Sequence, residues 1–218
     1  MASRRAWMTP GRAIERAPMA GYNCSFIAVE DVKAFDEILY ILMCGTGVGF
    51  SIERQFISKL PTIGATIVID DSNIPQVSIA DHMVKSETVI KVRDSKSGWS
   101  EAFASLLDHL YRGQIPGWDT SAVRAAGEPL KTFGGRASGP QPLIDLFKFA
   151  CKMVTNAVGR RLTSVECHDL VCKIADIVVV GGVRRSALIS LSNLSDDRMR
   201  GAKSGQCWIE NGQRGLAN

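Results

Sequence analysis

Cys24 is the single residue of this sequence that is best placed to carry out chemistry. It lies in the run Tyr-Asn-Cys-Ser-Phe at residues 22–26, at the start of a segment that fits a β-strand. A reactive thiol beside a bound ligand can do redox or nucleophilic chemistry. A cysteine on a buried strand can equally be a small apolar residue of the core. No partner thiol for Cys24 stands out in the sequence, so the residue alone leaves both interpretations open.

A glycine-rich segment, Gly45-Thr-Gly-Val-Gly49, follows a helical pattern and leads into a second strand. Glycine lacks the Cβ atom that keeps a ligand away from the backbone, so such a loop suits close approach to a nucleotide. The segment matches neither the G-x-G-x-x-G pattern nor the P-loop pattern. A tight helix-to-strand turn therefore explains it as well as a binding loop does.

Two further loops combine glycines with cations. Residues 131–140 hold Lys131 and Arg136 among glycines and hydroxyls, and such a loop can offer amides and charges to phosphates. Residues 181–185 read Gly-Gly-Val-Arg-Arg and suit a loop that changes shape with its ligand. A solvated surface loop is the alternative in both cases.

Cys167, His168 and Cys172 come nearest to a zinc-ligand pattern. All three fall within one predicted helix, and the sequence offers no matched second pair for a tetrahedral site. We therefore predict no metal site. Cys44 and Cys151 fit helix packing, and Cys207 has no assigned role.

The composition indicates a globular protein with a substantial core, because 45% of the 218 residues are apolar and the mean hydropathy is +0.04. Disordered and fibrous proteins do not have this balance. The net charge of +4 suits anionic small ligands, but no basic stripe indicates direct binding of nucleic acid. The sequence shows no secretory signal and no apolar run near the ~20 residues that span a bilayer. We therefore expect a cytoplasmic protein with reduced thiols and no membrane contact.

The pattern of apolar residues predicts mixed strands and helices, and hence an α/β fold. Strands are predicted at 22–29, 48–52, 66–69, 88–92 and 187–191. Helices are predicted between Asp31 and Gly45, between Ser97 and Gly113, at 143–158 and from 163 onward, the last with a capping box of Thr163 and Glu166. Residues 113–142 hold six glycines and four prolines and are predicted to form a long loop region.

Together, these motifs closely resemble the monomeric, adenosylcobalamin-dependent (class II) ribonucleoside-triphosphate reductases. The match runs in the family's order over about residues 20–218. It is carried by Tyr22–Phe26, Ala34–Leu42, Gly45–Phe50, Leu130–Pro140, Glu166–Lys173 and Gly181–Arg200.

The resemblance implies a fold and a division of the chain. The family fold is a ten-stranded α/β barrel, shared with glycyl-radical enzymes. Residues 1–218 would form the first half of it, an incomplete catalytic barrel domain. Residues 61–124 would be an inserted region that forms the effector site.

The resemblance also implies a reaction, the radical reduction of ribonucleoside triphosphates to the 2′-deoxyribonucleoside triphosphates used in DNA replication. Cobalamin homolysis makes a thiyl radical on a cysteine of a finger loop, and this radical removes the ribose 3′ hydrogen. A pair of cysteines then supplies two electrons as the 2′ hydroxyl leaves, and the pair becomes a redox-active disulfide. Cys24 matches one member of that pair.

Carried over residue by residue, the resemblance assigns binding roles to two groups. The substrate group is Asn23, Ser25, Thr46 and Gly47. The specificity and effector group is Asp31, Gly181, Gly182, Arg184, Arg185 and Ser186. Asp31 would accept an effector ribose hydroxyl, and plain N-capping of a helix explains this residue too.

The implied ligands and partners are a ribonucleoside triphosphate, a deoxynucleoside triphosphate effector, adenosylcobalamin and a thioredoxin-like reductant. The finger-loop cysteine, the second redox cysteine and most of the cobalamin site have no counterpart in the sequence. We therefore expect a fragment, or one half of a split enzyme complemented by a C-terminal chain, that is inactive alone. A catalytically dead effector-binding module and a remnant of an interrupted gene are the alternatives.

Overall fold

The computed structural model describes residues 15, 18–69, 75–79, 82–129, 135–180, 183–184 and 187–218. Several residues with predicted binding roles lie outside the described residues: Gly181, Gly182, Arg185 and Ser186. Residues 130–134, at the start of the loop that was predicted to offer amides and charges to phosphates, lie outside them as well.

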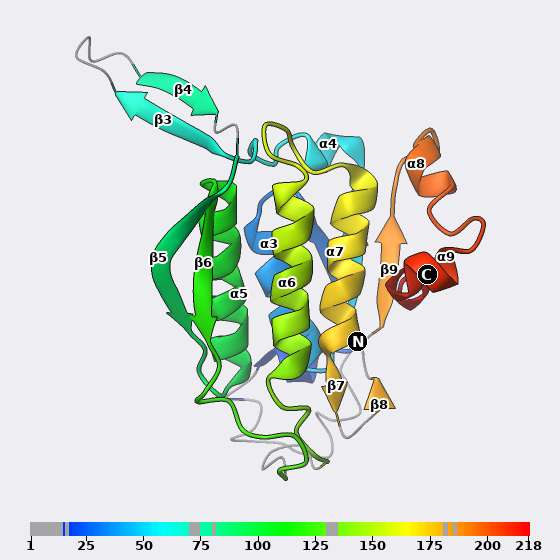
Figure 1. The fold of residues 1–218 in the computed structure, drawn as a ribbon. Helices are drawn as coiled ribbons and strands as arrows, with labels where there is room; N and C mark the ends of the chain where they lie inside the picture. The colour runs from blue at the N-terminus through cyan, green and yellow to red at the C-terminus, as the bar shows by residue number, and fades with distance from the viewer. Residues whose placement is uncertain are drawn as a thin grey trace.

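A three-stranded parallel sheet, called the central sheet below, lies behind the long helices in the view of Figure 1. Its strands, in spatial order, are β1 (Cys24–Ala28), β2 (Gly47–Ser51) and β9 (Leu188–Leu191). The chain end extends this sheet beside β9, because Ala217 bridges to Leu188 in parallel. The Asn218 N–H donates to the Leu188 carbonyl at 3.1 Å, and the Ser190 N–H donates to the Asn218 carbonyl at 2.9 Å.

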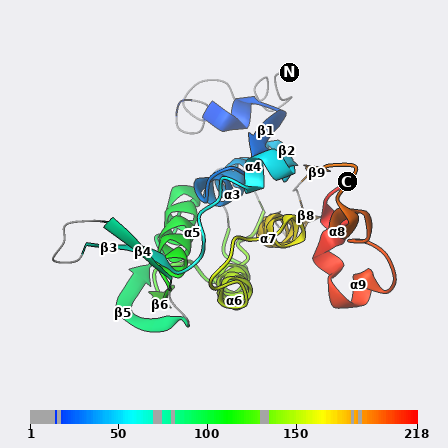
Figure 2. The same cartoon turned by 90° about the horizontal axis from the view of Figure 1, so that it is seen from above.

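Long helices cover one face of this sheet (Figure 2). They are α3 (Lys33–Met43), α5 (Lys96–Tyr111), α6 (Gln141–Thr155) and α7 (Ser164–Ile177). Helix α3 connects β1 to β2, α7 contacts both α3 and β9, and α6 lies between α5 and α7. The helices bury Val48, Phe50, Ile52 and Leu188 of the sheet in one continuous apolar core.

The opposite face of the sheet carries exposed side chains. Successive residues of a strand point to opposite faces, so the neighbours of the buried residues point away from the helices. Phe26 is 58% exposed, Ile189 is 56% exposed, and Cys24 is exposed as well. We call this side the uncovered face; it carries Cys24, Phe26, Gly47, Gly49, Ala187, Ile189 and Leu191.

Shorter elements surround this core. The strands β3 (Ala65–Ile69) and β4 (Pro75–Ile79) form an antiparallel hairpin that projects from the body (Figure 1). The strands β5 (Val84–Lys91) and β6 (Gln114–Asp119) pair in parallel beside α5, and β7 (Val179–Val180) pairs with β8 (Val183–Arg184). The remaining short helices are η1 (Pro18–Gly21), α4 (Arg54–Ile57), α8 (Asp197–Arg200), α9 (Cys207–Glu210) and η2 (Gly212–Leu216).

The sequence patterns predicted several of these elements correctly. The helix predicted between Asp31 and Gly45 is α3; its apolar stripe is buried, and Gly45 follows the helix end with a φ of 84°. The capping box of Thr163 and Glu166 at α7 is confirmed. The α/β class is confirmed by the parallel central sheet and its crossover helices, whereas the ten-stranded barrel stays a prediction.

Two local predictions were wrong. Ser95, not Ser97, caps α5, and its Oγ accepts the Gly98 N–H at 2.9 Å. The region 113–142 was predicted as a loop, but it contains β6. This segment forms a strand because it pairs with β5, and no local sequence pattern reveals that pairing.

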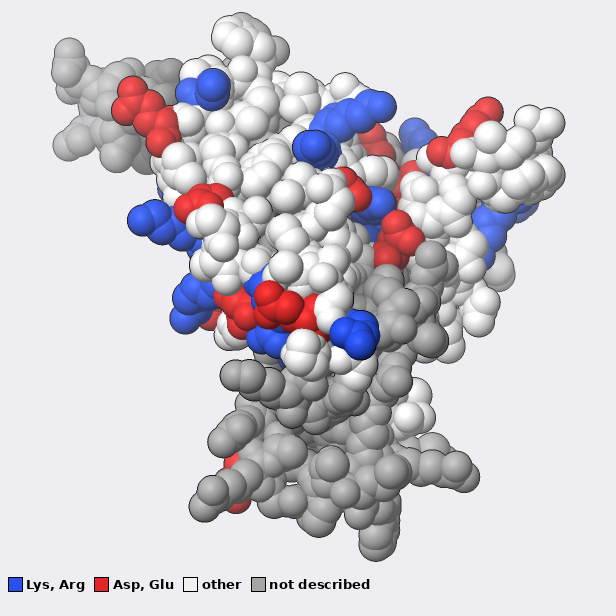
Figure 3. Space-filling view, turned by 60° about the horizontal axis from the view of Figure 1, so that its bottom comes forward, with Lys and Arg blue, Asp and Glu red and all other residues white. Residues whose placement is uncertain are grey.

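Two further observations concern membrane-spanning helices and the distribution of surface charge. No helix in the part of the chain that the structure describes is long and apolar enough to cross a membrane. On the face shown in Figure 3, the cations and carboxylates of the described residues are interspersed rather than gathered into a field of one sign.

Candidate functional site

Cys24 opens β1, and the strand register pairs it with Gly47 at the start of β2. It is the exposed cysteine of the chain, since the other five are buried or half-buried. The side-chain amide of Asn23 lies 3.6 Å from the Cys24 Sγ and can donate to it. An amide and a thiol therefore lie side by side at the N-terminal end of the sheet.

Gly47 lies between Cys24 and Ala187, so three distant parts of the chain meet in one row. The Gly47 N–H donates to the Asn23 carbonyl at 3.0 Å, and the Val48 N–H donates to the Ala187 carbonyl at 2.9 Å. A methyl group on Gly47 would lie 3.5 Å from the Ala187 Cβ, which is an ordinary contact. Gly47 also has no positive φ. Nothing among the described residues requires glycine here, so the missing side chain keeps the uncovered face clear.

Thr46, predicted to lie at the substrate, has a buried side chain that is 1% exposed. Its Oγ1 lies 2.7 Å from the Met19 carbonyl and 3.0 Å from the Tyr22 carbonyl. Its backbone N–H donates to the Ile41 carbonyl at 3.3 Å. The hydroxyl of Thr46 thus ties the segment that leads into β1 to the start of β2.

Ser25 is half-buried, and its hydroxyl donates to the Gly47 carbonyl at 3.0 Å. This bond links β1 to β2 directly beside Cys24. Alternation along β1 places Ser25 on the face opposite to Cys24. The structure therefore gives Ser25 a part in strand pairing, and its contact with substrate stays a prediction.

Asp31 and Arg184 lie at opposite ends of the sheet. Asp31 follows the C-terminal end of β1, where its carboxylate accepts the Lys33 N–H at 2.8 Å. Seven residues separate it from Cys24, which corresponds to about 20 Å of extended strand. Arg184 belongs to β8, shortly before Ala187 and hence near the Cys24 end. The structure brings Cys24, Gly47 and the chain after Arg184 together, but not Asp31.

Burial lowers the reactivity of four thiols: Cys44, Cys151, Cys167 and Cys172. It raises the pKa of Cys151 to about 11 and that of Cys172 to about 12, and it also raises the pKa values of Cys44 and Cys167. These thiols stay protonated near neutral pH and make poor nucleophiles. Within the described ranges, no group of three or more His, Cys, Asp or Glu side chains is placed to hold a metal ion.

A hollow of about 490 Å³ lies between α4, the start of α7 and the turn before α8. It is lined by Arg54, Ile57, Thr163, Ser164, Ser195, Asp196, Asp197 and Arg198. Its residues follow the C-terminal ends of β2 and β9, so it lies at the opposite end of the sheet from Cys24. The hollow is not part of the Cys24 site.

Strand alternation predicts that Phe26 shares a face with Cys24, and the structure agrees. Sequence reasoning missed the neighbours from β9 that complete the uncovered face. For Ala187 and Ile189 no local signal exists, because only the pairing of β9 with β2 brings them to Gly47 and Gly49.

Comparison with known proteins identifies the family. A family model for the insertion domain of B12-dependent ribonucleotide reductase matches residues 63–154. The chain is 34% identical over 178 residues to the adenosylcobalamin-dependent ribonucleoside-triphosphate reductase of Levilactobacillus brevis, covering 72% of this chain and 24% of that protein. The chain belongs to the B12-dependent ribonucleotide reductase family.

Further similarities support this assignment to the reductase family. The corresponding enzyme of Lacticaseibacillus paracasei is 33% identical, over 89% of this chain and 32% of that protein. The crystal structure of a B12-dependent (class II) ribonucleotide reductase superposes with a TM-score of 0.80 at 24% identity, covering 100% of this chain and 35% of that one. The chain thus spans 24–32% of the length of these two curated relatives. The match at 63–154 overlaps the insertion predicted at 61–124, and those exact bounds stay a prediction.

Proposed function

We propose that this chain supplies Cys24 as one redox thiol, and one wall of the substrate site, to an adenosylcobalamin-dependent ribonucleoside-triphosphate reductase. The observation that carries the proposal is the row of Cys24, Gly47 and Ala187 on the uncovered face. It places an exposed thiol beside a glycine that the described part of the chain does not itself require.

The proposed role of Cys24 follows from the electron balance of the reaction. The ribose C2′–O bond breaks, a C2′–H bond forms, and the hydroxyl leaves as water. Two thiols supply the two electrons and two protons and become a disulfide, so Cys24 needs a second thiol. A thioredoxin-like dithiol then restores both thiols by exchange.

The second thiol of the proposed pair is not on the uncovered face of this chain. The other five cysteines lie within helices or at a helix end: Cys44, Cys151, Cys167, Cys172 and Cys207. We propose that the partner thiol comes from another part of the enzyme. The chain by itself then makes no deoxynucleotide.

The remaining predicted residues divide into those that face a ligand and those that hold the strands. We propose that the Asn23 amide and the bare backbone of Gly47 lie against the ribose. Thr46 and Ser25 would act indirectly, through their bonds to neighbouring carbonyls. The specificity stretch of Gly181, Gly182, Arg184, Arg185 and Ser186 directly precedes Ala187 in the chain, and we propose that it reads base or phosphate. Asp31 would contact only a separate effector nucleotide.

Adenosylcobalamin is proposed for the enzyme from the family alone. The hollow near α4 is lined by two arginines and two aspartates and lies at the far end of the sheet from Cys24. A broad, largely apolar macrocycle does not match that lining. No step of the chemistry of this chain is therefore assigned to the cofactor.

The substrate wall can be tested with a methyl group. Gly47→Ala fits the strand without a clash, and its Cβ projects into the proposed ribose position. We expect about ten-fold weaker binding of ribonucleoside triphosphates, measured by titration calorimetry with ATP, GTP, CTP and UTP. The matched control is Gly212→Ala, because an added Cβ at Gly212 has no neighbour within 4 Å. Equal affinities of Gly47→Ala and the parent chain would contradict the proposed wall.

A further inference from the structure

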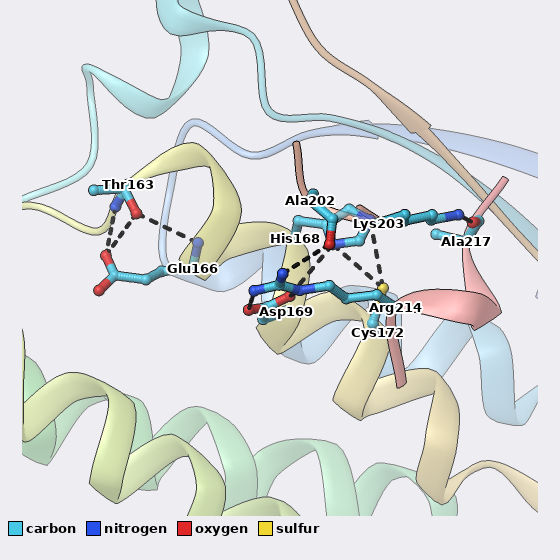
Figure 4. Close-up of polar contacts among 9 residues, drawn as sticks. All are labelled: Thr163, Glu166, His168, Asp169, Cys172, Ala202, Lys203, Arg214 and Ala217. Carbon is cyan, nitrogen blue, oxygen red and sulfur yellow. Dashed lines mark hydrogen bonds and ion pairs between the residues drawn. The ribbon is translucent and has the colours of Figure 1, made fainter. Parts of the chain in front are cut away.

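Asp169 and Arg214 form a buried ion pair between α7 and the end of the chain (Figure 4). Arg214 Nε donates to Asp169 Oδ1 and Arg214 Nη2 donates to Oδ2, both at 2.6 Å, so the pair is bidentate. The Asp169 and Arg214 side chains are only 11% and 16% exposed. Burial alone would raise the pKa of Asp169, but Arg214 and His168 hold it below its ordinary value.

Arg214 also fixes the turn that follows α8. Its Nη1 donates to the Ala202 carbonyl at 2.8 Å. The next residue of that turn, Lys203, donates from its Nζ to the Ala217 carbonyl. The guanidinium thereby donates from all three of its nitrogens to hold η2 against α7 and the turn after α8, a geometry that a lysine cannot reproduce in full.

Immediately after η2 the chain pairs with β9. Ala217 and Asn218 hydrogen-bond to Leu188 and Ser190, and β9 in turn pairs with β2. On its inner side α7 reaches β2 directly, because the His168 ring lies 6.0 Å from the Phe50 ring. The contacts therefore form a continuous ring. Helix α7 contacts Arg214, the residues after Arg214 pair with β9, β9 pairs with β2, and β2 contacts α7.

We propose that Arg214 is a positioning residue that, by pairing with Asp169, holds β9 in place against β2 and so fixes the Ala187 side of the Cys24 site. The link to nucleotide binding rests on the proposed function, whereas the link to β9 does not. Replacing both members of a buried ion pair by neutral residues often changes overall stability little, whereas removing one member leaves the other charge buried and unpaired. The directional bonds of the pair fix one arrangement, so we expect loss of the whole pair to alter local order at β9 rather than overall stability.

The test is amide hydrogen exchange in the double variant Asp169→Asn/Arg214→Met, which leaves no buried charge unpaired, and in Arg214→Lys, both in the whole chain. The Ser190 and Val48 amides report on β9, since they donate to Asn218 and Ala187. We expect the double variant to speed their exchange about ten-fold or more while α5 amides keep their rates, and Arg214→Lys to retain part of the protection. Ribonucleoside triphosphate affinity should fall in the same order.

The control is Arg200→Met, which removes an arginine from an exposed pair with Asp197 at 3.2 Å in the neighbouring helix α8. It should leave exchange and affinity unchanged. Unchanged exchange at Ser190 and Val48 in Asp169→Asn/Arg214→Met would overturn the proposal, as would faster exchange throughout α5, which marks a merely structural role. If the double variant does not fold, Arg214→Lys alone must still speed exchange at Ser190. If the parent chain binds no nucleotide, the proposed function fails while the exchange data still decide the role of Arg214.

Discussion

Thr46 shows how a residue can belong to a site without touching its ligand. It was predicted to lie at the substrate, and it directly precedes Gly47. Its hydroxyl, however, is buried and faces the Met19 and Tyr22 carbonyls. Cys24 presents an exposed thiol and Gly47 a half-buried backbone at the same place, so the ligand would meet thiol and backbone rather than this hydroxyl.

Thr46→Val should therefore lower stability and spare binding. Valine has nearly the shape of threonine but lacks the one hydroxyl proton that Oγ1 shares between the two carbonyls, and its loss costs about 1–3 kcal/mol of the free energy of unfolding. Urea unfolding measures this loss, and Thr46→Ser, which keeps the hydroxyl, should recover most of it. Ribonucleoside triphosphate affinity of the folded variant should stay within about two-fold. A large loss of affinity with unchanged stability would instead place the hydroxyl at the ligand.

At the scale of elements, the packing of α3 against α5 joins the central sheet to the segment matched by the insertion-domain model. The Ser100 hydroxyl of α5 donates to the Asp36 carbonyl of α3 at 2.9 Å. Burial at this contact, with the neighbouring Glu37 carboxylate, raises the pKa of Asp36 from 3.8 to about 6. The junction therefore holds a carboxyl group that is more easily protonated in the folded state than in the unfolded chain.

Asp36→Asn should stabilise the chain at neutral pH. The folded state binds the Asp36 proton more tightly, so the parent loses stability as pH rises from about 3.8 to about 6. Asparagine removes that charge and so raises the free energy of unfolding. Because the position is half-exposed, solvent screening limits the expected gain to about 1 kcal/mol at pH 7–8. Denaturant unfolding across pH should show the difference disappear near pH 4. Asp108→Asn, in an exposed pair with Arg112, is the control and should show no such gain. A gain independent of pH would contradict the burial argument.

At the scale of the whole molecule, local sequence patterns correctly predicted the features that depend on residues close together in the sequence. The α3 stripe, the α7 capping box and the α/β class rest on spacings within one element. The site does not, because Cys24, Gly47 and Ala187 meet only through the strand order β1-β2-β9. The same holds for Arg214 and Asp169, which lie 45 residues apart. The family resemblance named Cys24 and Gly47, but only the sheet revealed Ala187 and the buried hydroxyl of Thr46.

The most direct test of the account is whether nucleotide shields Cys24. The rate of Cys24 alkylation by iodoacetamide can be followed by mass spectrometry, with Cys207 in the same molecule as an internal reference. The account predicts that saturating ribonucleoside triphosphate slows alkylation of Cys24 about ten-fold and leaves Cys207 unchanged, whereas inorganic tripolyphosphate protects neither. Equal alkylation of Cys24 with and without every ribonucleoside triphosphate would contradict the placement of the substrate beside this thiol.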